Sequence, residues 1–126
     1  MIVRRSLVAT IALGLLIPGA SALAAPAEVL RATYTAAPPA QVQTGSGFVV
    51  PVTLANTGTD PWSSTGPQPV NLGYHWIDIA GSTVVWDGAR TPLGGDVLAG
   101  AQRVVQAAVQ APPNPGSYFL LFALVQ

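Results

Sequence analysis

Proline and glycine recur every few residues between Pro38 and Gly116, and this spacing most constrains what the chain can fold into. Both residues interrupt α-helices. Proline lacks a backbone N–H and clashes with the preceding turn, and glycine loses more backbone entropy on ordering than any other residue. The segments between them alternate apolar and polar residues or are rich in β-branched residues, which is typical of β-strands. We therefore expect no helix after residue 24.

Strand-like segments occur at regular intervals and are separated by turn-forming residues. We predict six of them, at 28–34, 48–56, 70–79, 83–86, 102–110 and 117–125. Short strands at this spacing, without helices between them, indicate two antiparallel sheets packed face to face. The predicted fold class is therefore all-β, an immunoglobulin-like antiparallel β-sandwich of about six strands, preceded by a helical signal peptide.

The N-terminus has the charged, apolar and small-residue order of a secretory signal peptide. Arg4 and Arg5 precede an apolar run at 7–17, and an A-x-A pattern ends at Ala24, with a second one ending at Ala22. The apolar run has roughly 11 residues, fewer than the ~20 needed to span a bilayer as a helix. We predict cleavage after Ala24; cleavage after Ala22 and an uncleaved anchor are the alternatives.

The remaining residues, 25–126, suit one domain in the exported space (extracellular, periplasmic or cell envelope). They contain three arginines and five acids, for a net charge of −2, and no lysine or cysteine. Without a basic patch the domain is not expected to bind nucleic acid, because phosphate contacts need clustered cations. Disulfides are excluded, so stability must come from the core. No membrane contact is expected beyond the possible anchor.

Several motifs stand in a characteristic order. They are F-V-V-P-V-T-L-A-N-T-G-T-x-P-W from Phe48, L-G-Y-H-W from Leu72, V-V-W-D-G-A-R-T-P-L from Val84 and A-P-x-x-P-G-S-Y from Ala111. This order resembles bacterial immunoglobulin-like modules of secreted or envelope proteins and of glycan-active enzymes. The N-T-G-T-x-x-W turn is similar to NBR1-type and bacterial cell-adhesion-type immunoglobulin-like domains. The resemblance covers residues 28–125 and implies a non-catalytic accessory or adhesion module, not an enzyme.

The expected final strand of such a module is missing after the segment 117–125. Tyr118, Leu120, Phe122 and Leu124 should face the core, yet the alternate residues of this segment are also apolar. An apolar strand with an open edge favours pairing with another chain. A truncated gene is one explanation of this pattern; another protein or a second copy that completes the sheet is the other.

The segment 70–79 carries the aromatic residues expected in the core. Period-two alternation places Val70, Leu72, Tyr74 and Trp76 on one face and His75 on the opposite face. A buried tryptophan on the third strand is typical of immunoglobulin-type sandwiches. The predicted core is Leu72, Tyr74, Trp76, Val50, Val52, Tyr118 and Phe122.

The polar residues do not make a convincing catalytic or metal site. A zinc site needs three or four His, Cys or carboxylate ligands, and the chain has one histidine and no cysteine. Asp78, Asp87 and Asp96 are scattered and do not match a calcium loop. No G-x-S-x-G motif supports a hydrolase. Asp78 and Asp87 could approach across the 79–86 hairpin as a glycosidase pair, but a small, charge-poor domain disfavours this. We expect no metal and no cofactor.

Five residues remain as candidates for ligand binding: Trp62, His75, Trp86, Asp87 and Arg90. Trp86 beside Asp87 and Arg90 could stack on a sugar and hydrogen-bond it, whereas Asp87 and Arg90 could instead stabilise their own loop. Trp62 could be exposed or could cover one end of the sandwich. The predicted function is an exported, non-catalytic structural or interaction module, and the alternative is a carbohydrate-binding module that binds a glycan through these residues.

Overall fold

The computed structural model describes residues 2–4 and 30–126. Most of the predicted signal peptide, including both predicted cleavage sites, lies outside these residues. In the described part of the chain no helix is long and apolar enough to cross a membrane.

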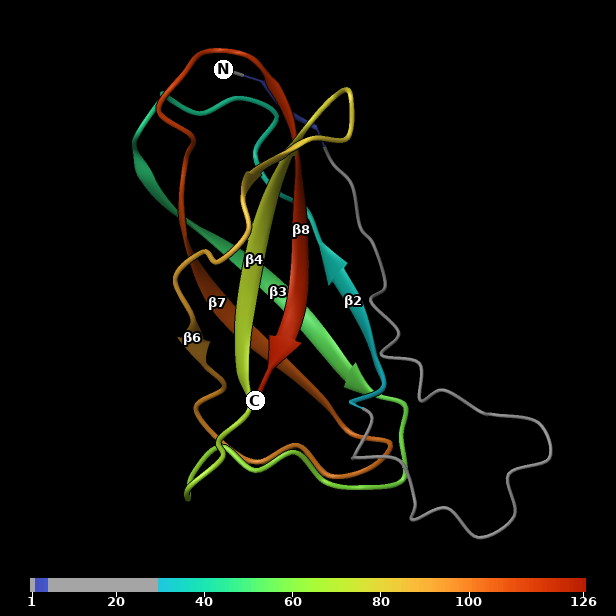
Figure 1. The fold of residues 1–126 in the computed structure, drawn as a ribbon. Helices are drawn as coiled ribbons and strands as arrows, with labels where there is room; N and C mark the ends of the chain where they lie inside the picture. Colours follow the sequence, from blue (N-terminus) through green and yellow to red (C-terminus); the bar gives the residue numbers. More distant parts are fainter. Residues whose placement is uncertain (1, 5–29) are drawn as a thin grey trace, which may run out of the picture.

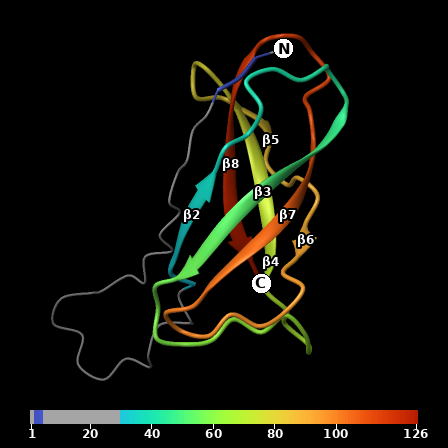
Figure 2. The ribbon, with the colours of Figure 1, turned by 180° about the vertical axis from the view of Figure 1, so that it is seen from behind.

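Two sheets form the domain, and the all-β, two-layered antiparallel prediction is confirmed. Sheet A has the strand order β1-β8-β4-β5, with β6 also paired to β4, and sheet B has the order β2-β3-β7. Only β1 is parallel to its neighbour, β8. Figure 1 shows β4 and β8 in front of the diagonal strands β3 and β7, and Figure 2 shows the same crossing from behind. The strands are β1 (Ile2–Arg4), β2 (Ala32–Ala36), β3 (Gly47–Asn56), β4 (Asn71–Asp78), β5 (Thr83–Val85), β6 (Thr91–Pro92), β7 (Gln102–Gln110) and β8 (Ser117–Val125).

The core lies between the sheets and is built by alternation along each strand. The burial pattern alternates along β3 and β7, while β4 and β8 pair in register from Asn71 opposite Val125 to Asp78 opposite Tyr118. Every residue of the predicted core is buried, with Trp76, Val50 and Val52 at 0% exposure. The core prediction is therefore confirmed. Other buried members are Leu54, Trp62, Val70, Leu93, Val97, Val105, Ala107, Val109 and Leu120.

Two aromatic side chains of β4 connect the sheets by hydrogen bonds as well as by packing. The Trp76 Nε1–H donates to the Gln110 carbonyl at 2.8 Å, and the Gln110 N–H donates to the Tyr74 hydroxyl at 3.0 Å. A buried indole or phenol needs such a partner, because an unmatched polar group in the core is costly. Trp76 and Tyr74 in sheet A are thus tied to the end of β7 in sheet B.

Three strand predictions differ from the structure. The first predicted strand, 28–34, is observed as β2 at Ala32–Ala36, where it pairs with β3. Between the predicted strands 83–86 and 102–110, where no strand was predicted, the structure contains β6, whose two residues pair with Asn71 and Leu72. β1 was not predicted, because it lies in the predicted signal peptide and pairs with residues more than 110 positions away. In each case the difference comes from tertiary pairing, which local pattern does not report.

In the uncleaved chain, the outer edge of β8 is partly occupied by other residues of the same chain. β1 pairs in parallel with Ser117–Phe119, and the Leu124 N–H donates to the Tyr34 hydroxyl of β2 at 3.0 Å. Burial raises the pKa of the Tyr34 phenol, and the hydrogen bond from Leu124 opposes this shift. Tyr34 therefore stays neutral at ordinary pH and joins the two sheets at this corner. Completion of the β8 edge by another chain stays a prediction.

Candidate functional site

The outer face of sheet A carries His75, as predicted from strand alternation. Side chains of β4 and β8 lie opposite each other on this face, with His75 paired to Leu121 and Ile77 paired to Phe119. These four side chains are half-buried. The outward positions of β4 and β8 contain no acid and no arginine. These outward positions of β4 and β8 are therefore largely apolar, and β1 places Arg4 opposite Phe119 on the far side of β8.

His75 and Trp86 stack on one another at this surface. Their ring centroids are 4.2 Å apart with an interplanar angle of 17°. The His75 Nδ1 also contacts the Trp86 backbone carbonyl, which only accepts, so Nδ1–H is the donor. Trp86 nevertheless remains 61% exposed. One face of the indole is therefore covered by the imidazole, while much of the ring is open to solvent.

The backbone around β5 explains why Trp86 reaches this position. The pairing of β4 with β5 shifts register between Trp76 and Ile77, so β5 is irregular where it approaches His75. Beyond β5, the Gly88 N–H donates to the Tyr74 carbonyl at 3.0 Å, which returns the chain to β4. A Cβ at Gly88 would come within 2.4 Å of the Tyr74 ring, so glycine is needed for this close passage. The hydrogen bond from Gly88 to Tyr74 and the stacking on His75 hold Trp86 over the outer face.

Asp87 and Arg90 differ in their relation to this stack. Asp87 follows Trp86 directly and is exposed. Arg90 is also exposed, but it lines a polar hollow of about 550 Å³ near the start of β4 and the end of β8. The hollow is otherwise lined by Pro67, Gln68, Pro69, Asn71 and Gln126. The structure thus brings His75 and Trp86 together, with Asp87 next to Trp86 in the chain, and it places Arg90 in a different environment.

Trp62 is buried at 2% exposure and does not present its ring to solvent. Its N–H donates to the Val97 carbonyl at 2.8 Å, and the Val97 N–H donates to the Trp62 carbonyl at 3.0 Å. These bonds hold the 56–70 loop against the 93–100 loop at one end of the sandwich. Trp62 therefore covers one end of the sandwich, which was one of the two alternatives for it. Its buried ring is not open for a ligand to stack on.

Two of the carboxylates that could have formed a catalytic pair or metal site stabilise turns. Asp78 Oδ1 accepts hydrogen bonds from the N–H groups of Ala80 at 3.0 Å and Ser82 at 2.8 Å, across the β4–β5 turn. Asp96 Oδ1 accepts from the Ser64 N–H at 2.8 Å and from the Ser64 hydroxyl at 2.9 Å. Within residues 2–4 and 30–126, no group of three His or acidic side chains lies close enough to hold a metal ion.

The Asp96 carboxyl is expected to titrate below its ordinary range. The N–H and hydroxyl of Ser64 stabilise the ionised form and lower the Asp96 pKa from 3.8. Because the folded pKa lies below the unfolded one, this contribution to stability is present above about pH 4 and is lost as pH falls through the folded pKa. A chemical-shift titration of Asp96 measures the effect. The Ser64→Ala variant should raise the Asp96 pKa partway toward 3.8, and equal values in both proteins would contradict the assignment.

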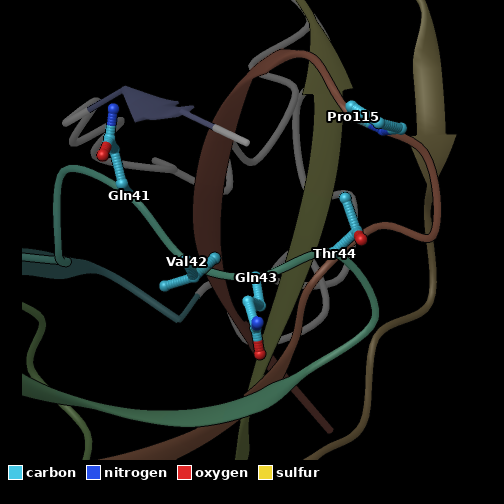
Figure 3. Close-up of a pocket in the computed structure, with 5 residues that line it drawn as sticks. All are labelled: Gln41, Val42, Gln43, Thr44 and Pro115. Carbon is cyan, nitrogen blue, oxygen red and sulfur yellow. The ribbon is translucent and has the colours of Figure 1, made fainter.

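Two other hollows carry no histidine and no carboxylate. One, of about 550 Å³, is lined by Gln41, Val42, Gln43 and Thr44 on a single loop and by Pro115 on the loop before β8 (Figure 3). The other, of about 330 Å³, lies where β3 and β7 meet Tyr74; its lining is Gly47, Phe48, Val49, Tyr74, Ala89, Ala108, Val109 and Gln110. General acid–base chemistry needs a suitably placed proton donor or acceptor. In the second hollow the Tyr74 hydroxyl already accepts a hydrogen bond from the Gln110 N–H.

The stacking of His75 on Trp86 was not predicted, although both residues were candidates. The available signals were the outward position of His75 and a tryptophan at the end of a short hairpin strand. No family model, curated protein or solved structure matches the chain.

Proposed function

We propose that the chain is an exported, non-catalytic module of the immunoglobulin-like type that binds a partner in the cell envelope or extracellular space. The partner would contact the outer face of sheet A around Trp86. The observation that carries this proposal is the exposed Trp86, held by His75 on a largely apolar sheet face.

The strand order supports the immunoglobulin-like assignment. Sheet B (β2-β3-β7) corresponds to strands A, B and E of such domains, and the β8-β4-β5 part of sheet A corresponds to F, C and C′. Trp76, which is fully buried on β4, would then be the buried tryptophan that such domains carry on strand C. The Tyr118 hydroxyl donates to the Asn114 carbonyl at 2.8 Å, four residues upstream. A tyrosine near the start of strand F with this bond is a hallmark of the family, the tyrosine corner.

A non-catalytic role is supported by how the reactive side chains are used. His75 donates to the Trp86 carbonyl, and Asp78 and Asp96 accept hydrogen bonds from neighbouring turns. A general acid or base needs neighbouring groups that shift its pKa and orient it toward a substrate in a cleft. His75 is half-buried on the sheet face and Asp87 is exposed beyond β5, and neither lines any of the hollows described above. The predicted N-terminal leader and the low charge support export.

A binding comparison tests the proposal. The full chain and two variants, Trp86→Ala and Val104→Ala, are immobilised and probed with fractionated envelope proteins and polysaccharides. Val104 is a matched control, because it is 57% exposed on the outer face of sheet B. We expect binding in at least one fraction, weakened at least about tenfold by Trp86→Ala and unchanged by Val104→Ala. Equal binding by both variants, or chemical turnover of the ligand, would contradict the proposal.

A further inference from the structure

We infer that the ligand at this surface is a neutral carbohydrate, one of whose sugar rings stacks on the open side of the Trp86 indole. The inference rests on the proposed function and names the ligand class for the same site. It depends on the orientation of the ring, the area available around it and the charges nearby.

The Trp86 ring is ordered before any ligand arrives. The imidazole of His75 lies nearly parallel to it at 4.2 Å, and His75 contacts the Trp86 carbonyl as well. An immobilised aromatic ring loses little conformational entropy on binding, so more of the contact energy appears as affinity. Sugar rings present one or both faces as a set of C–H groups, and a flat, fixed indole suits such a face. The open side of Trp86 thus has the shape that a sugar ring requires.

The available area favours a small ligand over a protein surface or a second copy of this chain. A stable protein interface buries about 800 Å² on each partner. A single aromatic side chain supplies at most about 150–250 Å². His75, Ile77, Phe119 and Leu121 on the face are already half-buried, whereas Ile79 (64% exposed) and Val84 (39% exposed) on the β4–β5 hairpin remain open. Even with these two side chains, the open apolar area is below the ~800 Å² of a stable interface. A ligand of a few sugar units, stacked on one tryptophan, matches the exposed surface better.

The polar groups near Trp86 fit hydroxyl groups and not a charged ligand. The exposed carboxylate of Asp87 can accept hydrogen bonds from sugar hydroxyls. Because the His75 Nδ1 is engaged by the Trp86 carbonyl, its second ring nitrogen, Nε2, is the one that can bond a ligand. Arg90, the nearest arginine in sequence, lies in the separate hollow near the start of β4. The exposed Asp87, next to Trp86 in the sequence, adds a negative charge that disfavours an anionic polysaccharide.

Tryptophan fluorescence gives a direct test on the full chain. Trp86 is exposed, whereas Trp62 and Trp76 are buried. A ligand that covers Trp86 should therefore shift only the part of the fluorescence emission that comes from Trp86. The probes are neutral cello-, chito-, xylo- and malto-oligosaccharides, with heparin as the anionic control. We expect one neutral series to shift the emission to the blue and heparin to leave it unchanged. Trp86→Ala should weaken binding at least about tenfold, Trp86→Phe less, and Val104→Ala not at all.

Three outcomes would overturn the inference. If no neutral oligosaccharide binds, but an envelope protein binds and loses affinity in Trp86→Ala, the carbohydrate assignment is wrong and the interaction function stands. If instead the protein dimerises with concentration in sedimentation, and Trp86→Ala abolishes the dimer, the occupant is a second copy. Failure of every Trp86-dependent interaction would remove the proposed function as well.

Discussion

Replacing Trp76 with alanine is expected to remove a large part of the free energy of unfolding. Trp76 is fully buried, packs against Tyr118 with ring centroids 6.1 Å apart, and bonds the Gln110 carbonyl across the sheets. Truncation of a buried tryptophan costs about 3–5 kcal/mol, and a domain of this size has about 5–15 kcal/mol in total. Without disulfides, no covalent link offsets the loss. Urea unfolding followed by circular dichroism measures the change.

Two variants give this prediction its controls. Trp76→Phe keeps much of the volume but leaves the Gln110 carbonyl without its donor, so a loss of about 1–3 kcal/mol is expected. Trp86→Ala removes the same side chain from an exposed site, and a change of at most about 1 kcal/mol is expected there. Similar losses for Trp76→Ala and Trp86→Ala would mean that the core is not where the structure places it.

A comparable loss is expected from Asn56→Asp, at the end of β3. Asn56 is 1% exposed, and its Nδ2 donates to the carbonyls of Asp60 at 2.8 Å and Val97 at 3.1 Å. Its Oδ1 accepts from the Gly58 N–H at 3.0 Å, a bond that aspartate could keep. An ionised carboxylate would face the two carbonyl oxygens without a donor between them. Such an uncompensated buried charge costs about 3–5 kcal/mol.

The loss in Asn56→Asp should depend on pH. Burial raises the pKa of the new carboxyl above the unfolded value of about 3.9. Relative to the native protein, the variant is therefore least destabilised below about pH 4 and increasingly destabilised as pH rises through the folded pKa. Urea unfolding at several pH values measures this trend. Thr57→Ala, at the exposed neighbouring position, is the control and should change stability by at most about 0.5 kcal/mol. A loss that does not vary with pH would contradict this account of Asn56.

Local sequence pattern predicted the parts of the fold that depend on period-two alternation. The core positions of β4 and the outward position of His75 follow from alternation alone, because a one-residue shift would move Trp76 to the solvent. The boundaries of β7 and β8 also agree with the predicted ones, since glycine or proline precedes each strand. These features need no knowledge of which strands are neighbours.

The candidate site was predicted less well, because it depends on contacts that are distant or irregular. The stack of His75 on Trp86 requires the register shift opposite β5 and the close passage of Gly88 over Tyr74. Neither leaves a periodic signal in the sequence. Trp62 was a ligand candidate because the D-P-W-S-S segment resembles an exposed loop, yet its pairing with Val97 buries it.

Mapping the ligand contact surface by NMR tests the central claim most directly. The claim is that the outer face of sheet A around Trp86 is where this protein binds. In a titration with a ligand found to bind, the largest shifts are predicted at the Trp86 indole N–H and the His75 ring, with little change at Val49 and Val104 on sheet B. Shifts concentrated on sheet B, or at the Arg90 hollow without change at Trp86, would contradict it.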